Sequence, residues 1–66
     1  MVADRKKMEL AMSRACMNPQ DLAKAAEMPA QTINRALWGR GVRPATLGRI
    51  ARALGVDPED ILGKGS

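Results

Sequence analysis

The side chains best suited to chemistry in this sequence are amides and guanidinium groups in its central part. Gln31 and Arg35 can each bind a base edge through two hydrogen bonds, glutamine to adenine and arginine to guanine. No acidic residue occurs between Glu27 and Asp57. The same stretch holds five arginines, namely Arg35, Arg40, Arg43, Arg49 and Arg52. Because these arginines lack nearby counter-charges in the sequence, they predict an anionic partner, the alternative being a solvated basic surface.

The overall composition narrows the choice of partner. The 66 residues carry a net charge of +4 and a pI near 10.0, which fits an anionic partner. Trp38 is the only aromatic residue, whereas proteins that bind single strands usually stack bases on several rings. A double-stranded partner is therefore favoured over a single-stranded one. We expect one domain spanning 1–66, with a small core and little room for a deep, shielded pocket.

Residue types that other classes of protein need are scarce. Cys16 is the only cysteine and histidine is absent, so the chain by itself can build neither a disulfide nor a standard zinc site. An enzyme is the weakest interpretation, and we expect no metal, cofactor or small-molecule substrate. No apolar run is long enough for a membrane span, and residues 1–7 are too polar for a signal peptide. These features predict a cytoplasmic protein without a membrane partner.

The elements that must position the polar side chains are helices, because apolar residues recur at helical spacing almost throughout. Caps, prolines and glycines predict five helices, at 4–16, 18–27, 29–38, 44–54 and 58–62, with a mobile tail at 63–66. Asp4, Asn18 and Asp57 are the expected N-caps, and Gly39 and Gly55 the expected stops. The side chains expected to face the core are Met8, Ala11, Met12, Ala15, Met17, Leu22, Ala23, Ala26, Ile33, Ala36, Leu37, Leu47, Ile50, Ala51 and Leu54.

The second and third predicted helices, joined by a short turn at 27–29, have the pattern of a helix-turn-helix. In such a pair the second helix exposes polar side chains to a major groove about 12 Å wide, and the first helix braces it. Ala23, Met28 and Ile33 supply small and apolar contacts for that brace. The same spacing also fits an ordinary helical hairpin that does not bind DNA.

The segment 18–62 resembles the lambda-repressor-like (Cro/Xre-type) helix-turn-helix family. The matching parts are DLAKAAEMPAQTI, then Gly39, and then IARALGVDPEDIL, which corresponds to the fourth and fifth helices of such domains. The resemblance implies a compact, all-α domain of five helices. It also implies that the helix-turn-helix is formed by helices two and three and that the third helix lies in the major groove.

The resemblance carries residue roles onto this sequence. It implies base reading by the early outward positions of the third helix, Ala30, Gln31, Thr32 and Arg35, with Asn34 as a flank contact. It implies phosphate contacts at the start of the second helix and in the loop after the third, at Asn18, Gln20, Arg40 and Arg43, supported by helix N-terminal amides. Arg49 and Arg52 either contact DNA or lie on the solvent-exposed face of the fourth helix.

Three positions depart from the family pattern. The family commonly has a glutamine where Pro19 stands, and proline cannot make its phosphate contact. It usually has glycine where Glu27 stands, so we expect a helical or otherwise non-left-handed backbone there. Where a glutamate is frequent, Leu37 is expected to add to the core. We expect Trp38 to be a lid over the edge of the core, the alternatives being a partner or DNA contact.

Two functions remain open at this point. The first is a sequence-specific transcriptional regulator of the phage- or mobile-element-repressor type. It would act as a homodimer on a two-fold DNA site, paired through the fifth helix, the tail or the first helix. The second is a protein-interaction module, such as the antitoxin or co-regulator half of a pair, with Trp38, Leu37 and the methionines as exposed anchors. The salt dependence of duplex binding separates the two.

Overall fold

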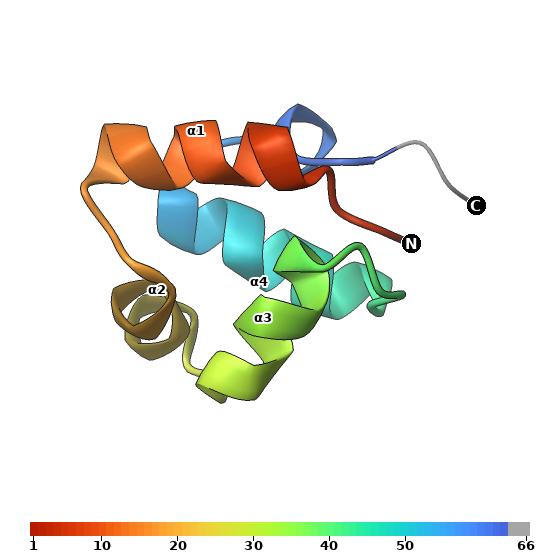
Figure 1. Cartoon of the computed structure of the whole chain (residues 1–66), viewed down its shortest axis with the longest axis horizontal. Coiled ribbons are helices and arrows are strands. Elements are labelled where there is room, and N and C mark those ends of the chain that lie inside the picture. Colours follow the sequence, from red (N-terminus) through yellow and green to blue (C-terminus); the bar gives the residue numbers. More distant parts are fainter. Residues whose placement is uncertain (64–66) are drawn as a thin grey trace.

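The computed structural model describes residues 1–63 of the chain. Within this range the chain forms four α-helices and one 3-10 turn, joined by short connecting segments. The elements are α1 (Arg5–Ala15), α2 (Pro19–Ala26), α3 (Ala30–Leu37), α4 (Pro44–Leu54) and the 3-10 turn η1 (Pro58–Asp60). In Figure 1, α1 lies across the top, with α2 and α3 below it and α4 behind α3. The all-α class is confirmed, and the first four predicted helices lie where the sequence signals place them.

The fifth predicted helix, at 58–62, does not form, and the 3-10 turn η1 takes its place. The bonds of this turn run from Asp60 N to Asp57 O (2.9 Å) and from Ile61 N to Pro58 O (3.1 Å). Beyond η1 the chain extends, because Ile61 O accepts from Asp4 N at 2.8 Å. This pairing with the start of the chain removes the backbone groups that a further helical turn needs.

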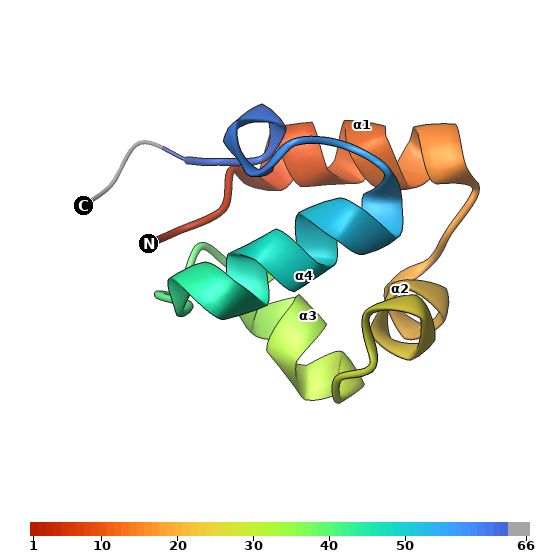
Figure 2. The same cartoon turned by 180° about the vertical axis from the view of Figure 1, so that it is seen from behind.

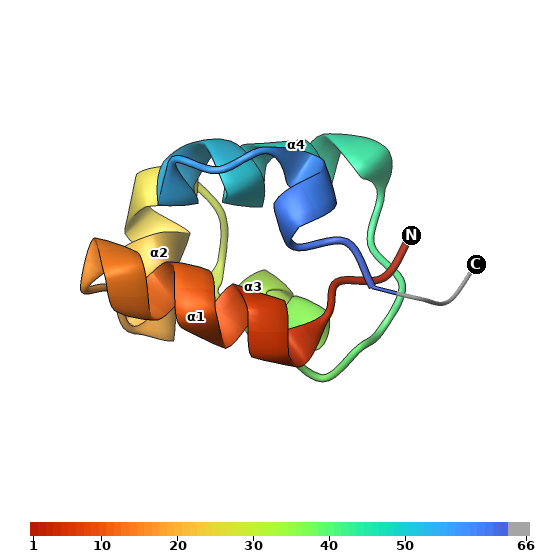
Figure 3. The same ribbon diagram turned by 90° about the horizontal axis from the view of Figure 1, so that it is seen from above.

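The segment before α1 and the segment after η1 lie side by side (Figure 3). Ala3 and Leu62 form an antiparallel bridge, and Gly63 N donates to Val2 O at 2.8 Å. Gly63 is therefore fixed rather than part of a mobile tail, and the rest of that predicted tail, 64–66, lies outside the described residues. Met1 pairs in turn with Val42, through backbone N···O distances of 2.7 and 3.1 Å.

One hydrophobic core draws on all four helices, and α4 crosses its back (Figure 2). Most predicted inward positions are buried, while Ala15, Met17 and Leu37 are half-buried against the core. The sequence interpretation missed two buried positions at the ends of the chain, Ala3 and Ile61. It placed Ile61 in the fifth helix without a core role, and it did not predict that this segment pairs with the start of the chain. The largest fully buried side chains are Met8, Leu22, Ile33, Leu47, Ile50 and Ile61.

The predicted N-caps of the first two helices form. Asp4 Oδ1 accepts from Lys7 N at 3.0 Å at the start of α1. At the start of α2, Asn18 Oδ1 accepts from Asp21 N at 2.7 Å, and Asp21 Oδ2 accepts from Asn18 N at 3.3 Å. This reciprocal pair is a capping box, and Pro19 follows in the first helical position. Side-chain hydrogen bonds thus hold the start of α2, the first helix of the predicted helix-turn-helix.

The backbone at Glu27 contradicts the sequence expectation. Glu27 has φ 56° and ψ 50°, which is left-handed, although a non-left-handed geometry was predicted for a glutamate. The cause is the tight turn into α3. Glu27 N donates to Lys24 O at 3.2 Å and Met28 N donates to Ala23 O at 3.0 Å, which closes the last turn of α2. The turn has the left-handed backbone geometry that suits glycine. Because glutamate has a Cβ atom, this conformation is strained at Glu27.

Glu27→Gly is expected to raise the free energy of unfolding by about 0.5–1 kcal/mol. Removing the strain of a left-handed non-glycine residue stabilises the folded state by roughly 1–2 kcal/mol. The extra conformational entropy of glycine in the unfolded chain offsets about half of that gain. Chemical denaturation followed by circular dichroism measures the gain. Glu27→Ala is the control, because it removes the carboxylate and keeps the strained φ. Equal stability of the two variants would show that charge, and not backbone geometry, sets the effect.

Candidate nucleic-acid interface

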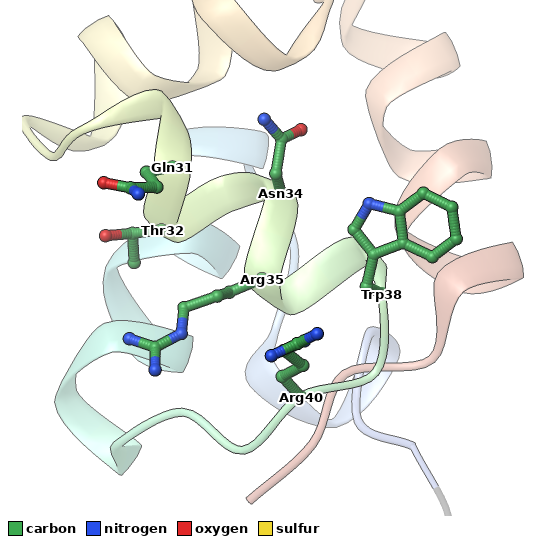
Figure 4. Close-up of a pocket in the computed structure, with 6 residues that line it drawn as sticks. All are labelled: Gln31, Thr32, Asn34, Arg35, Trp38 and Arg40. Atoms are coloured by element: carbon green, nitrogen blue, oxygen red, sulfur yellow. The ribbon is translucent and has the colours of Figure 1, made fainter.

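The outward face of α3 carries the polar side chains that the sequence singled out. Gln31, Asn34, Arg35 and Trp38 are spaced i, i+3, i+4 and i+7, and all four are exposed. With Thr32 and Arg40 they line one open hollow, shown in Figure 4. Ala30 begins the helix half-buried against the core. Four of the five predicted base-reading residues therefore share one surface, with Ala30 at its inner edge.

The opposite face of α3 holds the helix in place. Ile33 and Ala36 are fully buried, and α3 packs against α2 and α1. Ala23 is buried on the facing side of α2, and Met28 is half-buried in the turn. This is the brace that the sequence predicted. This packing leaves the polar side of α3 exposed.

A second hollow continues the first toward α4. It is lined by Thr32, Arg35, Gly41, Val42, Arg43 and Thr46. Arg43 is the N-cap residue of α4, and its side chain makes no capping hydrogen bond with the first-turn amides of this helix. The positive end of a helix favours anions. Thr46 was missed by the sequence interpretation, although its place two residues after Pro44, in the first turn of a helix, was a usable signal.

The loop that carries the two arginines between α3 and α4 is tied at both ends. Arg40 N donates to Arg35 O at 3.0 Å, and Val42 is paired with Met1. Arg40 and Arg43 are both exposed. Among residues 1–63 the observed ion pair joins Arg5 and Glu9, so neither loop arginine is neutralised by a carboxylate there. Their charge is directed at the same side as the polar face of α3.

Asn18 and Gln20 lie apart from these two hollows. Both are exposed at the start of α2. The Oδ1 atom of Asn18 is used in the capping box, which leaves its Nδ2 group as the part able to reach a phosphate. Asn18 lines a separate hollow, whose other residues include Pro19 and Leu37, two of the positions that depart from the family pattern.

Trp38 is not the lid over the core that the sequence predicted. Its side chain is 69% exposed, and it continues the outward face of α3. The guanidinium carbon of Arg5, on α1, lies 4.8 Å from the ring centroid, in a cation–π contact. The same arginine donates from Nε to Glu9 Oε1 at 3.0 Å. The i+7 spacing from Gln31 would have placed Trp38 on the polar face.

A comparison with known protein families identifies the family of this chain. The model for the Cro/C1-type helix-turn-helix DNA-binding domain matches residues 7–63. The chain belongs to the Cro/C1-type helix-turn-helix family. The match takes in most of α1 and all of the later elements, and it leaves out residues 1–6. No curated protein and no solved structure matched the chain.

Membership of the Cro/C1-type family makes this chain a DNA-binding helix-turn-helix protein of transcription regulation. α2 and α3 are the helix-turn-helix, and α3 is the second helix of the pair. Within residues 1–63, none of the helices has the length and apolar character that crossing a bilayer requires.

Proposed function

We propose that this Cro/C1-type protein binds specific sequences in double-stranded DNA and acts as a small repressor-like regulator of the phage or mobile-element type. One observation carries the proposal: α3 exposes Gln31, Asn34 and Arg35 on a single face, beside two loop arginines that form no ion pair among residues 1–63. Amide and guanidinium groups are the side chains that discriminate adenine and guanine in the major groove. The surrounding positive charge suits phosphates on either side of that groove.

In this proposal the side chains divide into two groups. Gln31 and Arg35 read bases, Thr32 offers a hydroxyl and a methyl group, and Asn34 reaches the flank. Ala30, half-buried, offers only a methyl group that could contact thymine. The second group positions the protein on phosphates and consists of Asn18, Gln20, Arg40 and Arg43. The N-terminal amides of α4 add to this group, with Thr46 as a further donor.

A homodimer on a two-fold site is part of the proposal. A single domain of this size offers few contacts, and domains of this kind pair so that their recognition helices lie about 34 Å apart, one turn of DNA. The predicted fifth helix does not form, so α1 and the terminal segments remain the candidate elements for pairing. Selection of bound duplexes from a random pool tests this, because a dimer selects a palindromic motif.

The salt dependence of binding tests the function itself. A chain that neutralises about five phosphates should show log K falling with log[salt] at a slope of about −4 to −5 per subunit. Fluorescence anisotropy of a labelled duplex, titrated at several salt concentrations, measures the slope. If no duplex is bound at low salt, DNA binding is not the function of this chain.

The exposed Trp38 favours a second candidate, a protein-interaction module on the same fold. Of the other anchors that this alternative needs, Met1 is exposed, Met17, Met28 and Leu37 are half-buried, and Met8 and Met12 are buried. The alternative predicts little or no duplex binding at any salt concentration. The salt titration therefore separates the two candidates.

A further inference from the structure

Trp38 is the large apolar side chain most exposed among residues 1–63, and it stands on the face that the proposed function uses. It is 69% exposed, against 57% for Leu10 and 46% for Met1. It lines the same hollow as Gln31, Asn34 and Arg40. In Figure 4 the nitrogen edge of the indole is turned toward Asn34, and the six-membered ring toward α1. An apolar ring at the end of a polar, basic surface suits a partner that is itself partly apolar and partly anionic.

We propose that Trp38 contacts the sugar–phosphate backbone of duplex DNA at the rim of the groove that α3 enters, with Arg5 braced against the ring. This inference rests on the proposed function and extends its interface onto α1. Deoxyribose offers an apolar surface to the ring, and the phosphate offers an acceptor to the indole Nε1–H. An indole has both an apolar body and one N–H donor, so it matches this combination.

The length of α3 places Trp38 at the backbone rather than at the bases. Trp38 lies seven positions after Gln31, which is about 10 Å along a helix that rises 1.5 Å per residue. The major groove is about 12 Å wide. A recognition helix that enters the groove with its N-terminal residues against base edges therefore carries Trp38 away from the bases and toward the phosphates at the groove's edge.

Arg5 prepares the ring for this contact. Its guanidinium group lies over one face of the indole at 4.8 Å, while its Nε is held by Glu9 Oε1 at 3.0 Å. The terminal Nη groups of Arg5 remain on a side chain that is 55% exposed, next to the ring. A phosphate at the groove's edge would meet the Nε1–H of Trp38 and the charge of Arg5 together. Charge complementarity thus favours DNA over an apolar protein partner as the occupant.

Fluorescence of the single tryptophan tests the inference directly. The wild-type chain is titrated with the duplex selected from a random pool, and anisotropy of the labelled duplex is recorded in parallel with Trp38 emission and acrylamide quenching. We expect the emission change to follow the anisotropy and quenching to fall on binding. Trp38→Ala should weaken binding about tenfold, for selected and random duplexes alike. Trp38→Phe keeps a ring without the N–H, so its affinity should lie between those of the wild type and Trp38→Ala.

Leu10→Ala is the matched control, since Leu10 is an exposed apolar residue of α1 in a different hollow, and it should bind like the wild type. Thermal unfolding confirms that each variant is folded. If anisotropy reports binding while Trp38 emission and quenching stay constant, and Trp38→Phe binds like the wild type, the inference is overturned and the proposed function stands. Absence of any anisotropy change overturns both. Protection of Trp38 on concentrating the chain without DNA would assign the ring to self-association and overturn the inference.

Discussion

Gln31→Ala is expected to lower affinity for the preferred duplex by about 5- to 150-fold, while affinity for a random duplex hardly changes. A bidentate contact to a base contributes about 1–3 kcal/mol of discrimination, and that is the range of the loss. Gln31 is exposed on α3, so its truncation removes no core contact. Anisotropy titrations with the selected duplex and with a scrambled duplex of equal length measure both affinities.

Arg40→Ala, measured in the same titrations, should weaken binding to both duplexes alike and reduce the salt slope by about 1. Arg40 lies in a loop beside α3, where a phosphate contact carries no sequence information. Arg14→Ala is the matched control. It removes the same charge from a hollow formed by α1 and η1, near Glu59 and Asp60, so it tests the effect of net charge alone. If Gln31→Ala and Arg40→Ala change the two affinities in the same way, the division into base readers and phosphate contacts is wrong.

Gly63→Ala is expected to lower the free energy of unfolding by about 1–3 kcal/mol, the usual cost of forcing a methyl group into a filled space. A Cβ at this position would lie 3.0 Å from the backbone C and O of Ala3 and from Asp4 N. These are backbone atoms held by the pairing of the two terminal segments, so they cannot rotate away as a side chain would. Gly63 has no left-handed φ, which leaves steric contact as the cause. Urea denaturation and amide exchange at Asp4 measure the loss.

Gly48→Ala provides the opposite control. Gly48 lies in the middle of α4, and a Cβ there meets nothing within 4 Å. Alanine should raise the free energy of unfolding by about 0.5–1 kcal/mol, since glycine is costly inside a helix. Should both alanine variants be stabilised, the two terminal segments do not approach each other as closely as described.

Much of the helical fold could be predicted because the signals are local. Asn18 followed by Pro19 marks the start of α2, Gly55 ends α4 in a left-handed conformation, and apolar spacing identifies the buried faces. The errors arise where distant segments decide the structure. The extension after η1 depends on pairing with residues 2–4, and no local pattern near Ile61 reports it. Glu27 is left-handed because the path from α2 to α3 requires it, against the preference of the residue itself.

The candidate site was predictable in part for the same reason. Helical spacing is enough to put Gln31, Asn34 and Arg35 on one exposed face. Trp38 was misassigned because large aromatic rings are usually buried, and its true neighbour, Arg5, lies on another helix 33 positions earlier. The sequence places Thr46 in the first turn of α4, but that this turn lies beside α3 depends on how the loop folds back.

The two corners of the chain that flank α2 share a property with consequences for how this domain can change. Cys16 and Glu27 both have φ 56°, so two non-glycine residues hold conformations that glycine adopts without strain. Replacing both with glycine should gain about 1–2 kcal/mol in all. For a domain of 60–100 residues each kcal/mol shifts Tm by about 4–8 °C. A lineage of such proteins therefore has a reserve of one-step stabilising substitutions outside α3, available to offset destabilising changes in the residues that select a new operator.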